Sequence, residues 1–140
     1  MPETDVIPTS ASTASVGKGI RYIGNWAYAF SGIGQAGSSG DFDALSFTSG
    51  SGVIKARIYC SIDNDDLNAG NQVGWKIVLN NIQILVARVE ATANDILDAS
   101  LTPYVDLIIP PFTKVDVVAF SNASNVDTSF LLSGRVYGAV

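Results

Sequence analysis

Three acidic side chains, Asp63, Asp65 and Asp66, form the densest acidic cluster of the chain, and Asn64 and Asn68 lie beside them. Oxygen ligands at such close spacing suit a hard cation such as Ca²⁺. The pattern of an EF-hand is not met, because no glycine occupies the sixth position of the loop and no glutamate the twelfth. The same residues are typical turn formers, so we interpret the cluster as a solvated hairpin loop and predict no metal or cofactor there.

The side chains of the commonest nucleophilic mechanisms are absent from this sequence. It has no histidine and a single cysteine, Cys60. These two counts exclude Ser-His-Asp and Cys-His catalysis, His-containing metal sites, Cys-rich zinc sites and an internal disulfide. Asp41 and Asp43 share one face of a strand, whereas a glycosidase needs two acids about 5 to 9 Å apart across a cleft. We therefore predict no catalytic residue and a protein that is not an enzyme.

An aromatic stripe precedes the glycine-rich segment. Tyr22, Trp26, Tyr28 and Phe30 fall on one side of an extended chain. Rings exposed on a flat sheet face form a platform for sugars, but the same spacing is typical of a strand that faces a core. We predict that this stripe faces the core.

Tyr59 and Tyr137 are better candidates for an exposed surface. Each shares its side of a strand with a basic side chain rather than with aliphatic ones, Tyr59 with Arg57 and Tyr137 with Arg135. We predict that Arg57, Tyr59 and Tyr137 belong to an interface.

The chain has 140 residues, 47% of them hydrophobic and only 15% charged, against a typical charged share of about 25%. This size suits one domain, and the high hydrophobic and low charged fractions exclude intrinsic disorder. The net charge of −5 makes the chain a poor binder of nucleic acid. No run approaches the roughly 20 apolar residues of a membrane-spanning helix. The low charge also leaves little to cover the surface of a monomer, which favours burial of part of it in an assembly.

Residues 1–18 are rich in Ser, Thr, Ala and Pro and are predicted to form an extended N-terminal arm, followed by a domain over 19–140. The arm lacks the features of a secretory signal. Val6, Ile7 and Pro8 form a short apolar anchor within it. Seventeen extended residues reach up to about 55–60 Å, so we predict that the arm lies against a neighbouring copy or another protein of the same assembly. A frayed terminus is the alternative.

Period-two alternation predicts about eight strands. They cover residues 20–30, 42–48, 53–62, 73–80, 82–90, 104–109, 113–121 and 128–137. Asn80-Asn81 predicts a tight hairpin, residues 31–40 a flexible loop, and 94–99 the one short helix. The expected fold is an all-β, antiparallel two-sheet sandwich that is jelly-roll-like, with an immunoglobulin-like sandwich as the alternative. The predicted core comprises Trp26, Ile54, Ile58, Cys60, Trp75, Ile77, Val117, Phe130 and Leu132.

The stretch 106–138 resembles the closing strands of small β-sandwich structural proteins of viruses and bacteriophages. The matching features are a strand ending in Ile109-Pro110-Pro111, its restart at 113–118, an Asn/Ser turn, and a last strand ending in 134–138. The arm resembles those that tie capsid subunits together. The resemblance implies a minor capsid, decoration (cement) or spike-base protein of the virion.

Such a subunit would bind the major capsid protein or other virion proteins. Exposed edge strands and low charge also predict a homo-oligomer, a trimer or a pentamer. The alternative function is a carbohydrate-binding module of a host-recognition fibre. That module would expose at least two aromatic rings on one patch, drawn from Trp26, Tyr28, Tyr59, Trp75 and Tyr137.

Overall fold

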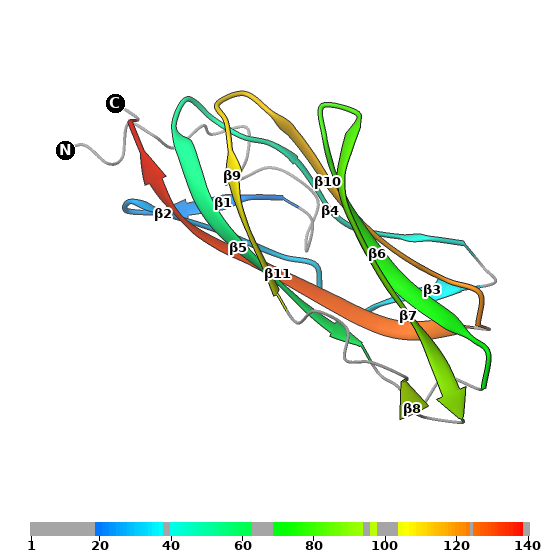
Figure 1. Ribbon diagram of the computed structural model, residues 1–140. Coiled ribbons are helices and arrows are strands. Elements are labelled where there is room, and N and C mark those ends of the chain that lie inside the picture. Colours follow the sequence, from blue (N-terminus) through cyan, green and yellow to red (C-terminus); the bar gives the residue numbers. More distant parts are fainter. Residues whose placement is uncertain are drawn as a thin grey trace.

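Two antiparallel β-sheets pack face to face in the computed structural model of the chain (Figure 1). The structure describes residues 19–37, 40–62, 69–93, 96–97, 104–123 and 125–138. The first sheet contains β1 (Arg21–Ile23), β2 (Trp26–Phe30), β3 (Gly34–Gly37), β5 (Val53–Ile62), β9 (Tyr104–Ile109) and β11 (Asn125–Tyr137). The second sheet contains β4 (Phe42–Thr48), β6 (Gln72–Leu79), β7 (Ile82–Ala93), β8 (Ile96–Leu97) and β10 (Lys114–Ser121).

Eight of these strands have the connectivity of a jelly roll. Their order is β2-β11-β5-β9 in the first sheet and β4-β10-β6-β7 in the second. Every connection between them crosses from one sheet to the other, except the β6–β7 hairpin, which stays within its sheet. This topology confirms the predicted jelly-roll-like sandwich, and it excludes the immunoglobulin-like alternative.

Alternation along the strands places the core between the sheets. On β5, the side chains of Ile54, Ala56 and Ile58 point inward and are buried. Between them, Lys55 is exposed and Arg57 is partly exposed. The rings of Trp75 and Phe130 meet across the sandwich with their centroids 5.4 Å apart. Seven of the nine predicted core residues are fully or almost fully buried: Ile54, Ile58, Trp75, Ile77, Val117, Phe130 and Leu132. Cys60 also packs against the core but is only partly buried.

Trp26 contradicts the core prediction, as does most of the aromatic stripe. Trp26, Tyr28 and Phe30 are 44%, 38% and 54% exposed, and only Tyr22 packs against the core. The reason is the two-residue turn between β1 and β2, where Gly24 has a φ of +59°. Because Tyr22 pairs with Ala27, the reversal brings the two alanines of β2 to the inside and turns its three rings outward.

Two other predicted elements differ. Within the predicted glycine-rich loop, Gly34–Gly37 forms β3. It pairs with residues 125–128 at the start of β11, whereas β2 pairs with residues 131–135 of the same strand. A Cβ at Gly34 would overlap the ring of Phe42, so any other residue there would have to displace that ring. Of the predicted helix 94–99, the described pair Ile96–Leu97 is the strand β8, which pairs with β7. The rest of that segment, the arm 1–18 and the acidic cluster of Asp63, Asp65 and Asp66 lie outside the described residues.

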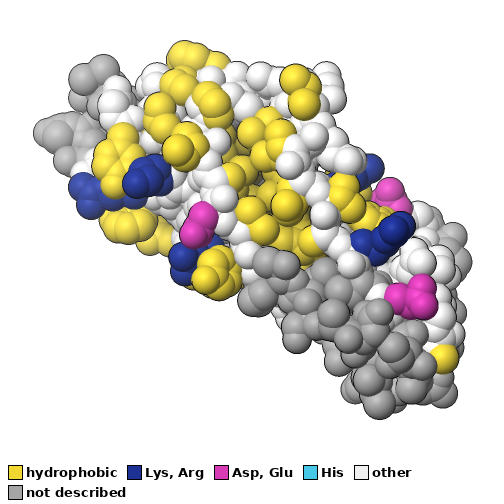
Figure 2. All heavy atoms as spheres, viewed as in Figure 1, with side chains coloured by type: hydrophobic (Ala, Val, Ile, Leu, Met, Phe, Trp, Pro, Cys, Tyr) yellow, Lys and Arg dark blue, Asp and Glu magenta, His cyan; other side chains and the backbone are white. Residues whose placement is uncertain are grey.

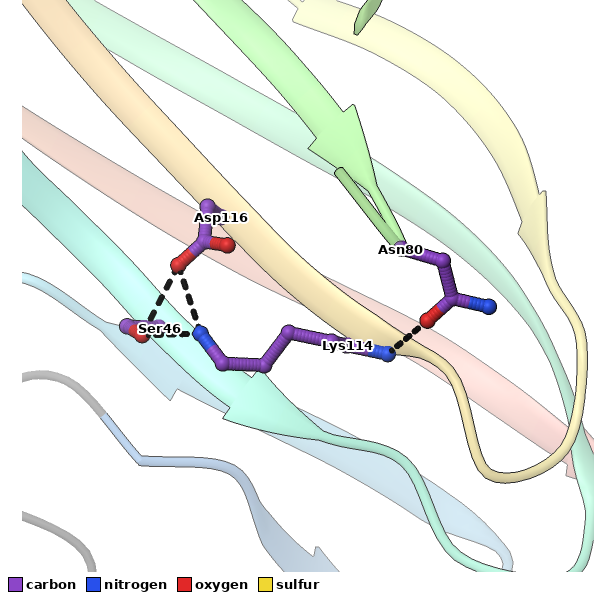
Figure 3. A network of polar contacts seen from close by, with 4 residues as sticks. All are labelled: Ser46, Asn80, Lys114 and Asp116. Carbon is purple, nitrogen blue, oxygen red and sulfur yellow. Dashed lines mark hydrogen bonds and ion pairs between the residues drawn. The ribbon is translucent and has the colours of Figure 1, made fainter. Parts of the chain in front are cut away.

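The predicted hairpin at Asn80-Asn81 is confirmed. Both residues have positive φ, 48° and 67°, as a type I′ turn requires. The Asn80 carboxamide also accepts a hydrogen bond from the backbone N–H of Lys114, 2.8 Å away. Beside it, the Asp116 carboxylate accepts hydrogen bonds from the Ser46 hydroxyl and the Lys114 ammonium, both at 2.8 Å (Figure 3). This part of the outer surface of the second sheet is therefore polar and internally paired.

Candidate functional site

The outer surface of the first sheet carries its side chains in rows that run across the strands, because residues paired in register lie side by side. The first row is Ile23, Trp26, Arg135, Lys55 and Ile108; the second is Arg21, Tyr28, Ser133, Arg57 and Asp106; the third is Phe30, Leu131, Tyr59 and Tyr104. Tyr137 lies one step beyond the first row on β11. We call these residues the outer patch.

The outer patch is unusually apolar for a surface. Among the described residues, fourteen large hydrophobic side chains are exposed, and nine of them belong to this patch. Ile23 is 70% and Ile108 60% exposed. Figure 2 shows Lys and Arg side chains beside hydrophobic ones where β2, β5 and the end of β11 lie in Figure 1. Large contiguous apolar surfaces of this kind mark interaction sites in soluble proteins.

Arg57 and Asp106 form the one ion pair described within the patch. The Arg57 guanidinium donates two hydrogen bonds to the Asp106 carboxylate, at 2.7 and 3.1 Å. This contact lowers the pKa of Asp106 below its usual value and raises the pKa of Arg57. The guanidinium also lies 4.1 Å from the ring centroid of Tyr104, whose ring is 6.0 Å from that of Tyr59. The charge of Arg57 is therefore already compensated within its own subunit.

Lys55 and Arg135 have a different environment. They are direct cross-strand partners between β5 and β11, so two positive charges stand opposite each other. The Arg135 guanidinium lies 5.8 Å from the centroid of the Trp26 ring and 5.6 Å from that of Tyr137. The Lys55 ammonium lies 6.0 Å from the same Tyr137 centroid. Aromatic faces attract these cations weakly at such distances, but no carboxylate of the patch pairs with them.

The patch is hollowed into an open basin around these residues. The basin has a volume of about 730 Å³, and its walls include Trp26, Lys55, Ile108, Arg135 and Tyr137. Its one acidic lining residue is Asp106, which Arg57 already binds. Across the described ranges, His, Cys, Asp and Glu side chains form no group of three that could hold a metal ion. The described segments also include no helix with the length and apolarity to cross a membrane.

The structure brings together three of the residues predicted for an interface. Arg57, Tyr59 and Tyr137 all belong to the outer patch, and both tyrosines are exposed. The other three predicted interface residues, Val6, Ile7 and Pro8, lie outside the described residues.

Sequence reasoning identified Arg57, Tyr59 and Tyr137 but missed other residues of the basin. The sequence predicts a core position for Trp26 and gives no interface role to Lys55, Ile108 or Arg135. The alternation of Lys55, Arg57 and Tyr59 along β5 was a usable signal for Lys55. The opposition of Lys55 to Arg135 was not visible, because it requires the pairing of β5 with β11.

The comparisons with known proteins find similarity at the level of structure. No family model matches the sequence, and no curated protein matches it. Among solved structures, the VP2 subviral particle of infectious bursal disease virus matches 79% of this chain with a TM-score of 0.47 and 8% identity. The Eiger TNF of S. frugiperda matches 81% with a TM-score of 0.42 and 11% identity. The Gt strain of infectious bursal disease virus matches 86% with a TM-score of 0.37 and 11% identity.

The lengths of these proteins differ. The matches cover 33% of the VP2 chain and 38% of the Gt-strain chain, so this chain spans about a third of the length of those two viral chains. They cover 94% of the TNF chain.

Proposed function

We propose that this chain is a non-enzymatic structural subunit of a virion, in a minor capsid, decoration or spike-base role. It associates with copies of itself through the outer patch and binds other proteins of the shell. The observation that carries the proposal is the gathering of nine of the fourteen exposed large hydrophobic side chains on one sheet face.

The composition of the patch supports a protein partner. Trp, Tyr and Arg are the residues most enriched where protein interfaces concentrate their binding energy. The patch has one Trp, four Tyr and three Arg, among them Trp26, Tyr28, Arg57 and Arg135. The virion setting is supported separately by the resemblance of the segment 106–138 to closing strands of capsid-type sandwiches.

The absence of an enzyme mechanism is part of the proposal. A carboxylate mechanism needs two acids that face each other across a cleft. The basin offers only Asp106, which is bound by Arg57, and the described part of the chain has no other acid among its walls. The basin is therefore better suited to contact than to bond cleavage.

The proposal is tested by sedimentation velocity over a concentration series up to about 100 µM, together with mass spectrometry of purified particles. We expect the wild-type chain to sediment as an oligomer and to occur in particles at a stoichiometric copy number. The double variant Trp26→Ser/Tyr59→Ser should shift the chain to monomer. The matched control, Ile82→Ser/Val86→Ser, changes two exposed apolar residues of β7 and should leave association intact. A wild-type chain that stays monomeric and is absent from particles would contradict the proposal.

A second function is favoured by a specific observation. Four of the five rings on which a carbohydrate-binding module would depend, Trp26, Tyr28, Tyr59 and Tyr137, are exposed in the one outer patch, and only Trp75 is buried. A glycan array separates the two functions. A hit that Trp26→Ala and Tyr137→Ala both abolish, from a chain that remains monomeric, would support the carbohydrate-binding module. If the chain is oligomeric and binds no glycan of the array, the result supports the structural subunit.

A further inference from the structure

The charge of this protein is divided unevenly between the outer patch and the rest of the molecule. The patch contains four basic side chains, Arg21, Lys55, Arg57 and Arg135, and one acidic side chain, Asp106, so its formal charge is +3. The whole chain carries −5, which leaves −5 − 3 = −8 for the remainder. Asp127, the next acid along β11, lies four residues beyond Leu131, outside the patch, where its carboxylate accepts a hydrogen bond from Gln35. Of this −8, five acids and three bases among the described residues outside the patch contribute −2, and residues outside the described ranges contribute the other −6. The described remainder is therefore mildly acidic, whereas the patch is basic and aromatic.

The placement of Lys55 opposite Arg135 lowers the stability of the isolated subunit. Like charges directly opposite each other on neighbouring strands destabilise a sheet. The only acid of the patch, Asp106, binds Arg57 with both of its oxygens and does not reach this pair. A carboxylate from outside the subunit would relieve the repulsion, and the walls formed by Trp26 and Tyr137 would shield it from water.

The sign of this charge distinguishes between the two ways in which copies can associate. A two-fold contact is isologous, so the patch would meet the same patch of its partner. Two surfaces of +3 would then face each other, and such juxtaposed like charges cost several kcal/mol. A head-to-tail contact instead brings the patch against a different surface of the partner, drawn from the part of the chain that carries −8.

We propose that the outer patch docks head-to-tail on a second copy of this chain, with Lys55 and Arg135 taking carboxylates of the partner that lie outside its own patch. This inference rests on the proposed self-association and adds the chemistry and the symmetry of the contact. Head-to-tail contacts that close form rings. Contacts that do not close form open chains of copies. In both cases a two-fold dimer through this face does not form.

The test compares the full chain with two charge-reversed double variants. Lys55→Glu/Arg135→Glu reverses the pair in the patch. Lys76→Glu/Arg88→Glu makes the same change in net charge on β6 and β7 of the second sheet. Sedimentation velocity and native mass spectrometry measure the oligomer, and circular dichroism with thermal melting establishes that each variant is folded.

We expect the patch variant to lose association by at least about a hundredfold in Kd, since each close charge pair contributes about 1.5 kcal/mol or more to an interface. The control should associate as tightly as wild type or more tightly, because it makes the remainder of the chain more acidic. Raising NaCl from about 50 mM to 500 mM should weaken wild-type association at least tenfold, since salt screens exposed charges.

The other outcomes overturn the inference in distinct ways. If wild type associates and the patch variant associates equally well, the head-to-tail contact is wrong while self-association stands. A wild-type species that ends at a dimer contradicts the head-to-tail contact. A wild-type chain that is monomeric at all concentrations overturns the proposed self-association together with this contact. If that monomer instead binds a heparin column and the patch variant does not, the occupant of the patch is an anionic polysaccharide.

Discussion

Lys55 and Arg135 are direct cross-strand partners, and both hold their charges over the ring of Tyr137, the ammonium 6.0 Å and the guanidinium 5.6 Å from its centroid. Two cations thus lie near one aromatic ring in a chain whose net charge is −5. This arrangement opposes the stability of the isolated chain, because like charges on directly paired residues of neighbouring strands repel each other. The same pair therefore allows folding and association to be examined separately.

Removing one of these charges should stabilise the isolated subunit. Lys55→Met keeps a long side chain on β5 but ends the like-charge opposition to Arg135. We expect the free energy of unfolding to rise by a few tenths of a kcal/mol at low ionic strength, and the gain to disappear in molar salt. Thermal melts of dilute, monomeric protein measure it. Arg88→Met on β7 serves as the control and should change little; a lower melting temperature for Lys55→Met would contradict the repulsion.

Truncation of the two tryptophans should change the unfolding free energy by very different amounts. Trp75 is completely buried against Phe130, so Trp75→Ala leaves a large cavity and should cost about 3–5 kcal/mol in unfolding free energy. Its indole N–H has no acceptor among the described residues, so Trp75→Phe should cost less, because it removes a buried unpaired donor. Trp26→Ala should change stability little.

Fluorescence provides an independent check on the same pair of residues. In a Trp75→Phe variant, all tryptophan emission comes from Trp26. Trp26 is 44% exposed, so iodide should quench this emission. Trp75 is shielded, and its emission in a Trp26→Phe variant should resist quenching until denaturant unfolds the chain. Equal quenching of both variants in the native state would show that the turn after β1 does not direct Trp26 outward.

Cys60 should be inert in the folded protein. Burial raises the pKa of its thiol to about 12, because the thiolate would lose its hydration. At pH 8 the reactive thiolate is therefore almost absent. We expect a thiol reagent such as 5,5′-dithiobis(2-nitrobenzoic acid) to label Cys60 only in denaturant, with the native rate limited by unfolding. Rapid labelling of the native chain would instead place the thiol at an accessible position.

Asp106 should titrate below its ordinary value of 3.8, because Arg57 stabilises its charged form with two hydrogen bonds. A folded-state pKa that is depressed contributes stability at pH values above the unfolded pKa, and this contribution is lost as the pH falls through the folded pKa. The effect on stability is small, since the pair is exposed. NMR of the Asp106 carboxyl carbon measures the midpoint. Arg57→Gln should move it back toward the ordinary value, and an unchanged midpoint would argue against the ion pair in solution.

Local patterns in the sequence were sufficient for most strands. Alternation in the stretch 53–62 correctly assigned Ile54 and Ile58 to the core and Arg57 and Tyr59 to the outer face, because side chains in a strand point to opposite faces in turn. The Asn80-Asn81 turn was predictable for a similar reason, since asparagine tolerates positive φ. Composition alone determined the absence of histidine chemistry and the low surface charge.

Only the tertiary structure decided what the outer patch contains. Periodicity cannot show that a turn interrupts it, so the side of Trp26 depended on the turn after β1 and on the pairing of Tyr22 with Ala27. Periodicity also cannot show which strands are neighbours in a sheet. Lys55 and Arg135 become partners only because β11, the last strand of the jelly roll, lies between β2 and β5. The physical reason is that alternation acts between adjacent residues, whereas this site is assembled by hydrogen bonds between strands far apart in the sequence.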